Sequence, residues 1–267
     1  MTVSRAILWV ALFTLTAAAG KAQEATPPAS SDADSPASCS KSLLFNFQRI
    51  HDDGEAGPEI PIWQVSGGSA FFYEAGMSID ADGAPNAYNP DDTGIDDLDN
   101  AGEPGHWWAL ALDENGEPYI QGDDDPFPGY YVSTTALADR EKDGNDPGRF
   151  VDASMIPYIV LPGSVARETG ARLGDFAMVL NRANGKVSYA IYADEGPSVG
   201  EGSVALAENL GVRSDARRGG ALDNIRYFVF PGSGNGKPRS VDEINEETEK
   251  LLGDSDADAV KGCTEAY

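Results

Sequence analysis

Histidine, cysteine and basic residues are scarce in this sequence of 267 residues, which has 2 His, 2 Cys and 19 Lys and Arg against 44 Asp and Glu. A zinc site would need a cluster of His or Cys ligands, and the sequence has none. A hydrolytic triad would need a nucleophile and an orienting acid around a histidine, and no Gly-x-Ser-x-Gly elbow is present. Carboxylates are the abundant reactive side chains that remain.

Positive charge is the largest deficit, because the chain carries a formal net charge of -25 at pH 7. Such a surface repels nucleic acids and anionic membranes, since both need cationic contacts. It would attract a polycation. Charge alone favours a plainer interpretation, in which the acidic residues keep the protein soluble or adapt it to salt.

Long apolar runs are absent after residue 20. Residues 1–22 combine a basic start, an apolar stretch and small residues, which predicts a secretory signal peptide cleaved after Ala19 or Ala22. The apolar stretch is too short to favour a transmembrane helix. We therefore expect a secreted protein, extracellular or periplasmic, without a membrane partner. A disordered leader rich in Ala, Pro, Ser and Asp is expected at 23–38, followed by one catalytic domain at 39–267.

The two cysteines, Cys39 and Cys263, lie near the two ends of the predicted domain. In an oxidising compartment an even pair favours a disulfide. Two unpaired surface thiols are the alternative, and the export signal favours the disulfide. Such a bond would tie the ends of the domain together.

Short runs rich in aromatic and β-branched residues recur along the domain between turn signals, and they predict strands. FAMVLNRANGKVSYAIYA is typical of a hairpin, with Asn184-Gly185 near its tip. The fold class is therefore mainly β, a single barrel-like domain. The predicted strands are 42–47, 69–80, 106–113, 118–121, 129–137, 157–162, 176–181, 187–193 and 225–230.

One or two short helices complete the expected fold. Residues 203–211 have apolar side chains at helical spacing and a stop at Gly211. Residues 240–253 begin with a capping box of Ser240 and Glu243 and end in glycine.

Acidic motifs allow more than one interpretation. IDADGAP contains Asp80-x-Asp82-Gly, a fragment that also opens calcium loops, but a complete loop needs further oxygen ligands at fixed positions. A turn held by the aspartate side chains is the plainer interpretation, and a calcium-stabilised surface protein is a weaker alternative. Further acidic clusters at 89–100 and 121–126 are either solvated loops or the lining of a cleft for a cationic substrate.

The segment YAIYADEGPSVGEGSVALAENLG, residues 189–211, places Asp194 and Glu201 at the two ends of a Gly/Pro loop. The loop is long enough to fold back and hold both carboxyls within about 10 Å. An inverting glycosidase needs two carboxyls about 6.5 to 9.5 Å apart, and a retaining one about 5 to 5.5 Å. Alternatively, Ser198 and Glu201 form a capping box and Asp194 is a turn residue. The residues alone leave these two interpretations evenly balanced.

The same segment resembles the active-site segment of the glycoside hydrolase family 75 chitosanases, which runs strand, Gly-Asp-x-Gly-Pro, Gly-Glu-x-Ser, then a helix ending in Leu-Gly. Ala193 stands where the family usually has Gly, a departure that affects how closely a sugar approaches. The resemblance covers roughly 71–252. Other segments resemble bacterial members in the same order: IDADGAPNAY, NAGEPGHWW, PGYYVSTTAL, DPGRFVDASMIPYIVLP, LGDFAMVLN and IRYFVFPGSG.

The resemblance implies an enzyme that cleaves β-1,4 glycosidic bonds of chitosan internally and with inversion. Its catalytic carboxylates would be Asp194 and Glu201, and the chemistry requires no cofactor and no metal. A monomer is expected, and a double-psi arrangement is the hypothesis for the barrel. Expected substrate-binding residues are Asp80, Asp82, Trp107, Trp108 and Tyr192, with an acidic groove extending to Asp91, Asp92 and Asp123 to Asp125.

Two other functions stay open. One is hydrolysis of another amino-sugar glycan on the same scaffold, which product analysis would separate from chitosan hydrolysis. The other is a non-catalytic secreted carbohydrate-binding protein. The presence of both Asp194 and Glu201 argues against pure binding, because binding alone does not need an acid and a base at these positions.

Overall fold

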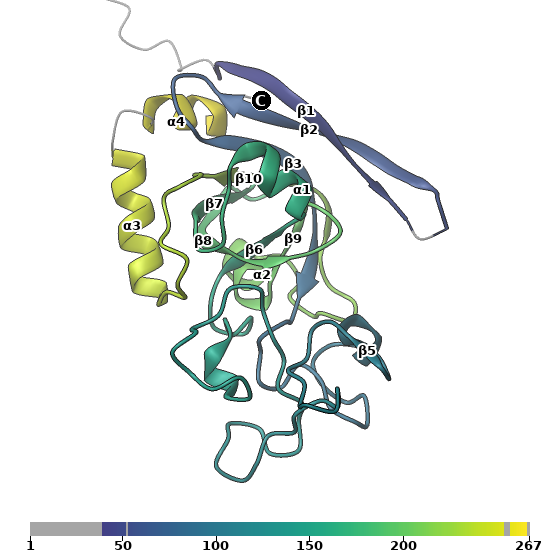
Figure 1. The fold of residues 1–267 in the computed structure, drawn as a ribbon. Helices are drawn as coiled ribbons and strands as arrows, with labels where there is room; N and C mark the ends of the chain where they lie inside the picture. Colours follow the sequence, from purple (N-terminus) through teal and green to yellow (C-terminus); the bar gives the residue numbers. More distant parts are fainter. Residues whose placement is uncertain (1–38, 52, 254–256, 266–267) are drawn as a thin grey trace, which may run out of the picture. The chain divides into compact units, whose positions relative to one another are not determined.

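The computed structural model describes residues 39–51, 53–253 and 257–265, so the predicted signal peptide and leader lie outside the described residues. Six strands close a barrel in the order β3-β10-β7-β8-β6-β9, because β9 also pairs with β3 (Figure 1). The predicted mainly β, barrel-like single domain is confirmed, while the double-psi arrangement stays a prediction. The barrel strands are β3 (Phe71–Asp80), β6 (Tyr158–Leu161), β7 (Phe176–Asn181), β8 (Lys186–Glu195), β9 (Glu201–Ser203) and β10 (Ala221–Val229).

Both faces of the barrel wall are buried. Side chains alternate between the faces of a strand, and two apolar clusters follow from this alternation. In β6, Ile159 belongs to one cluster, together with Tyr73 and Val179. Its neighbour Val160 belongs to the other cluster, which also contains side chains from the loops that precede β6.

Two parallel pairings, β3 with β9 and β6 with β8, interrupt the otherwise antiparallel barrel. β7 and β8 form the predicted hairpin, and Gly185 near its tip has a φ of 74°, which glycine adopts without a steric penalty. As a result, the carboxyl ends of β3 and β8 and the short strand β9 lie in one part of the barrel wall.

The segment between β3 and β6 contains little regular structure and forms the loops in the lower part of Figure 1. Its regular pieces are η1 (Leu98–Ala101), β4 (Gly102–Glu103), β5 (His106–Trp107) and η2 (Pro147–Arg149). The prediction of continuous paired strands at 106–113, 118–121 and 129–137 is therefore wrong. These segments meet one another only through isolated bridges such as Leu110 with Ser133.

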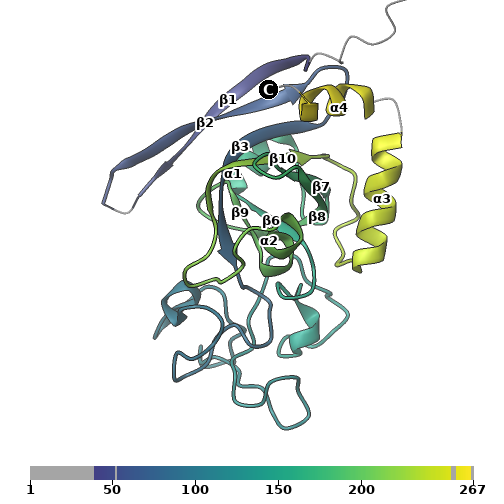
Figure 2. The ribbon, with the colours of Figure 1, turned by 180° about the vertical axis from the view of Figure 1, so that it is seen from behind.

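A long hairpin, β1 (Lys41–Ile50) and β2 (Ala56–Val65), extends beyond the barrel (Figures 1 and 2). β2 was not predicted, because Pro58 and Pro61 argue against a central strand. β2 meets β3 only through residues 63 and 64, so both prolines lie where β2 has no partner on its second edge.

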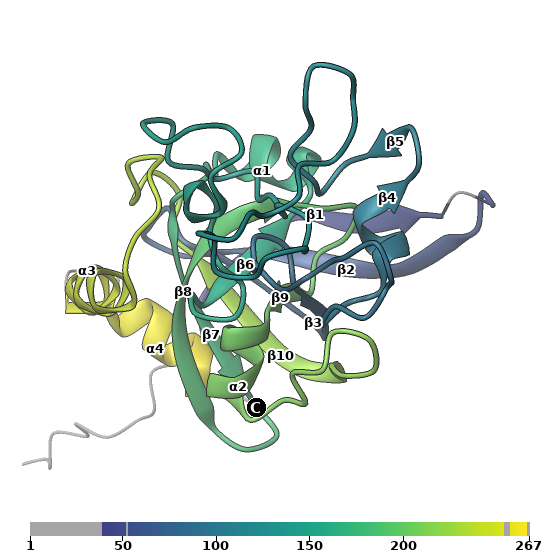
Figure 3. The same ribbon diagram turned by 90° about the horizontal axis from the view of Figure 1, so that it is seen from below.

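Four helices are described: α1 (Gly163–Thr169), α2 (Val204–Leu210), α3 (Val241–Gly253) and α4 (Ala257–Glu265). Figure 3 shows α3 and α4 on one side of the barrel. The two predicted helices are confirmed. α2 ends at Gly211 with a φ of 66°, and α3 begins with the capping box, in which the Ser240 amide donates to Glu243 Oε2 at 2.9 Å. The short helices α1 and α4 were not predicted. Within the described residues, we find no helix with the length and apolar character needed to cross a membrane.

The predicted disulfide between Cys39 and Cys263 is confirmed. It joins the residues before β1 to α4 across a sequence separation of 224 residues. Cys263 is fully buried among apolar side chains that also pack on the barrel strands. The bond therefore fastens α4 and the base of the hairpin to the same core.

We expect Cys39→Ser and Cys263→Ser each to lower the free energy of unfolding by about 2–5 kcal/mol, because the crosslink restricts a very long loop in the unfolded chain. Denaturant unfolding would measure this, and the double variant should match each single variant. Reducing agent should shift the wild type toward the variants and leave the variants unchanged. A wild type whose midpoint does not respond to reductant would contradict a stabilising role.

Candidate active site

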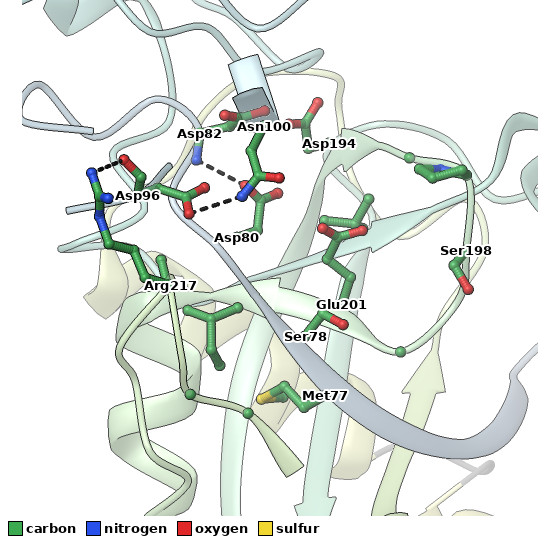
Figure 4. Close-up of a pocket in the computed structure, with 18 of the residues that line it drawn as sticks. Met77, Ser78, Asp80, Asp82, Asp96, Asn100, Asp194, Ser198, Glu201 and Arg217 are labelled. Carbon is green, nitrogen blue, oxygen red and sulfur yellow. Dashed lines mark hydrogen bonds between the residues drawn. The ribbon is translucent and has the colours of Figure 1, made fainter. Parts of the chain in front are cut away.

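A pocket of about 810 Å³ lies on the barrel wall where β3, β6, β8 and β9 meet (Figure 4). The loop 216–222 and Arg49 of β1 also line it. A pocket lined by many acids suits a cationic ligand. Seven of the described lining residues carry carboxyl groups: Asp80, Asp82, Asp96, Asp99, Asp194, Glu195 and Glu201.

Asp194 and Glu201 are positioned by the same residue of β6. Val160 pairs with Asp194 of β8 on one side and with Glu201 of β9 on the other. Residues paired directly across strands point to the same face of a sheet. Because neighbouring strands are about 4.8 Å apart, the two Cα atoms are about 9–10 Å apart, with both side chains on one face. This spacing is compatible with a water molecule between two working carboxyls.

A β-bulge sets the direction of the Asp194 side chain. Ile159 pairs with Tyr192 but the next residue, Val160, pairs with Asp194, so Ala193 is an extra residue in β8. An extra residue reverses the alternation of faces beyond it. The Asp194 side chain therefore points to the same face of the sheet as that of Val160, whereas the Tyr192 side chain points to the opposite face. Ala193 is not among the residues with positive φ, which explains why alanine is tolerated at this point.

Glu201 belongs to β9 and does not cap a helix. Ser203 caps α2 instead, since its Oγ accepts a hydrogen bond from the Leu206 amide at 3.1 Å. The alternative of a capping box formed by Ser198 and Glu201 is therefore wrong. Figure 4 shows the Glu201 carboxylate directed into the space that Asp80 and Asp194 also face.

Asp80 and Asp82 at the end of β3 form a compact group with Asp194. One carboxylate oxygen from each residue lies within 4.8 Å of the others. The Asp82 amide donates to Asp80 Oδ1 at 2.8 Å, so the expected aspartate turn is present as well. The Tyr88 hydroxyl donates to Asp82 at 2.7 Å and also bonds Asp96. Turn formation and pocket lining are thus combined in the same two aspartates.

Backbone amides hold Asp194 in place. Its Oδ1 accepts hydrogen bonds from the Ala136 amide at 2.8 Å and from the Glu195 amide at 2.9 Å. These bonds favour the ionised form of the carboxyl. Among the residues that the structure describes, no donor makes a comparable hydrogen bond to the Glu201 carboxyl.

Burial and mutual repulsion raise the pKa values of this group. Burial, followed by the charge of Asp80, raises the pKa of Glu201 to about 8, although Arg49 opposes the rise. Burial raises the pKa of Asp80 to about 6. Burial and then the charge of Asp80 also raise the pKa values of Asp82 and Asp194. Near neutral pH the pocket therefore holds both protonated and ionised carboxyls.

A family model described as "Fungal chitosanase of glycosyl hydrolase group 75" matches residues 77–257. The chain belongs to this family. The matched segment contains Asp80, Asp82, Asp194 and Glu201, and thus the strand ends that form the acidic pocket. A search of curated proteins found no match.

Of the three aromatic residues expected to bind substrate in this chitosanase family member, one lines the pocket. Trp108 is 66% exposed, and its Nε1 donates to the Asn100 carbonyl at 2.8 Å. Trp107 is half-buried against Tyr131 and is not part of the lining. Tyr192 is fully buried in an apolar cluster, because it precedes the bulge and faces away from the pocket.

The acidic lining differs from the predicted groove. Asp91, Asp92 and residues 123–125 do not line the pocket. Arg217 binds Asp92 at 2.9 Å and also pairs with Asp97, which ties these acids into the loop structure. Asp96 and Asp99 do line the pocket, but the sequence offered no signal that separates them from their acidic neighbours. Arg49 was also missed, because its hairpin lies far from the pocket in sequence.

The group of Asp80, Asp82 and Asp194 offers hard oxygen ligands of the kind that bind divalent cations. All three groups are carboxylates, and each already accepts a hydrogen bond. Asp80 accepts from the Asp82 amide, Asp82 from the Tyr88 hydroxyl and Asp194 from the Ala136 amide. The same closeness also lets the three groups share protons, which is the chemistry that their raised pKa values support.

We expect Glu201→Gln to stabilise the protein at pH 8 and to change it little at pH 4. A carboxyl whose pKa is raised on folding opposes folding once the unfolded chain ionises, so stability falls between about pH 4 and pH 8. Glutamine removes this penalty and should raise the Tm at pH 8 by roughly 3 °C or more.

Thermal unfolding from pH 4 to pH 9 tests this expectation. Glu168→Gln, the same change on an exposed residue of α1, is the matched control and should leave the pH dependence unchanged. A Glu201→Gln variant that loses stability equally at every pH would contradict the raised pKa.

Proposed function

We propose that the protein is a secreted, endo-acting chitosanase that hydrolyses β-1,4 glycosidic bonds with inversion, using Asp194 and Glu201. The observation that carries the proposal is their common pairing with Val160, which presents both carboxyls to one pocket about two strand spacings apart. Family membership supports the substrate class.

The hydrogen bonds support a division of roles. Glu201, with a pKa raised to about 8, keeps its proton near neutral pH and donates it to the glycosidic oxygen as the bond breaks. Burial and the charge of Asp80 raise the pKa of Asp194, but two backbone hydrogen bonds oppose this rise and favour the ionised form. In that form Asp194 takes the proton from the attacking water. The water oxygen bonds to the anomeric carbon from the opposite face. Asp82, whose pKa is raised by burial and by the charge of Asp80, holds a proton in place of Asp194, since three adjacent carboxyls resist full ionisation.

The pocket charge supports a cationic polysaccharide as substrate. Protonated amines of chitosan would bind the acidic lining through complementary charge, with Asp80, Asp96 and Asp99 beside the reacting pair. The exposed ring of Trp108 offers an apolar face on which a sugar ring packs. Asp82 has a carboxylate oxygen within 4.8 Å of a carboxylate oxygen of the reacting Asp194, so it influences the ionisation of that residue as well as binding.

The remaining properties follow from this proposal. A disulfide suits an oxidising compartment outside the cytosol. Residues 39–267 act as one catalytic domain, and the protein is a monomer. Because several segments resemble bacterial members of the family, our hypothesis is that this is a chitosanase of the bacterial type.

We expect Asp194→Asn and Glu201→Gln each to lower kcat on highly deacetylated chitosan by at least about 100-fold, because each amide removes one proton transfer. Release of reducing ends measures the effect, and Glu168→Gln should retain wild-type activity. Near-normal turnover in both amide variants would contradict the assignment. A folded wild type that binds chitosan without cleaving it would move the protein to the binding class.

A further inference from the structure

Arg49 brings a positive charge to a pocket whose lining holds more carboxyl groups than cationic ones. It lies on β1, in the hairpin that precedes the matched segment 77–257. The two-carboxylate chemistry does not use this guanidinium. Its position in the pocket therefore needs a separate explanation.

Arg49 lies opposite a bulge in β2 of the hairpin. Gln48 pairs with Glu59 and Ile50 pairs with Ala56, so two residues of β2, at 57 and 58, stand opposite Arg49 alone. Such a bulge bends the strand pair and increases its local twist.

The hydrogen-bonding capacity of Arg49 is incompletely used. Its Nε is buried and has no hydrogen bond partner among the described residues, and it makes no ion pair within 4.0 Å there. Its charge nevertheless acts on Glu201, whose pKa it lowers against the effect of burial. Because Arg49 lines the pocket, an oxygen of a bound ligand can accept a hydrogen bond from the guanidinium.

Arg217, which also lines the pocket, is different. Its guanidinium bonds Asp92 and Asp97 and the carbonyls of Gly94 and Asp96, so its donors are engaged in holding the loops. Arg49 is the lining residue whose cationic group combines a buried, unpartnered donor with nearness to Glu201.

We propose that Arg49 selects an uncharged, N-acetylated sugar at the subsite beside Glu201. The proposal rests on chitosan as the substrate. The guanidinium repels the ammonium of a glucosamine unit, whereas an acetamido carbonyl can accept a hydrogen bond from the guanidinium. Ammonium groups on neighbouring sugars bind the acidic part of the lining, such as Asp96 and Asp99.

Binding of defined tetrasaccharides tests the proposal without turnover. In the Asp194→Asn background, calorimetry gives the Kd for fully acetylated and fully deacetylated tetramers. Arg49→Met should change the ratio of these Kd values in favour of the deacetylated tetramer by about ten-fold, because it removes both the repulsion and the donor. Arg49→Lys keeps the charge and should weaken binding of the acetylated tetramer while leaving the deacetylated one nearly unchanged.

Arg140→Met is the matched control, since Arg140 is an exposed cation outside the pocket and the substitution changes net charge equally. Its Kd ratio should equal that of the parent. Arg49→Gln provides a second neutral variant should the methionine disturb the hairpin, and thermal unfolding confirms folding of each variant. Equal Kd ratios in the folded Arg49→Met, Arg49→Gln and Arg140→Met proteins would overturn the proposal.

Products from partially acetylated chitosan give an independent readout. In the products of the wild type, either the new reducing ends or the new non-reducing ends should be enriched in N-acetylglucosamine. The Arg49→Met variant should lose this enrichment. An unchanged composition of chain ends would overturn the proposal while leaving the chitosanase assignment intact. Conversely, a changed Kd ratio in a protein that cleaves no chitosan would defeat the proposed function and support selection by Arg49.

Discussion

Repulsion among buried carboxyl groups is the constraint on which the site depends. Asp80, Asp82, Asp194 and Glu201 come from three strand ends, and the barrel wall prevents them from moving apart. Burial and like charge therefore keep part of the group protonated. An acid that holds a proton beside a base that lacks one is the condition for two-carboxylate hydrolysis, so the energetic cost of the cluster is also the source of its chemistry.

The backbone of the barrel determines the separation of the reacting pair. β6 lies between β8 and β9, and the pairing of Val160 with both neighbours places Asp194 and Glu201 at one level. The bulge at Ala193 is as important as the strands, because without it Asp194 would face the apolar cluster that holds Tyr192. A distance held by hydrogen-bonded strands is less variable than one held by a flexible loop, which suits a reaction that requires a fixed geometry.

Much of the fold could be predicted from the sequence, because β7, β8 and β10 are apolar runs bounded by clear turns. β2 was missed because its prolines are acceptable only on an edge, and β9 because its three residues give no periodic signal. In the loops before β6, single bridges replaced the expected ladders. Local pattern cannot distinguish these cases, since they depend on which strands become neighbours.

The site was predictable to a similar degree. Asp194 and Glu201 were identified through the resemblance of one segment, and Asp80 and Asp82 through a turn motif. Their closeness depends on the parallel pairings of the barrel, which have no local signature. The same holds for Tyr192, which alternation within β8 places away from the pocket, and for Arg49, which the hairpin brings from the other end of the domain.

The measurement that most directly tests the central claim is the anomeric configuration of the first products. Proton NMR during the early hydrolysis of chitosan oligosaccharides distinguishes the anomers before mutarotation. Carboxyls on strands two spacings apart leave room for a water molecule, so we expect the α-anomer to form first from the β-linked substrate. Initial formation of the β-anomer would require a closer pair and a covalent intermediate, and would contradict the roles assigned to Asp194 and Glu201.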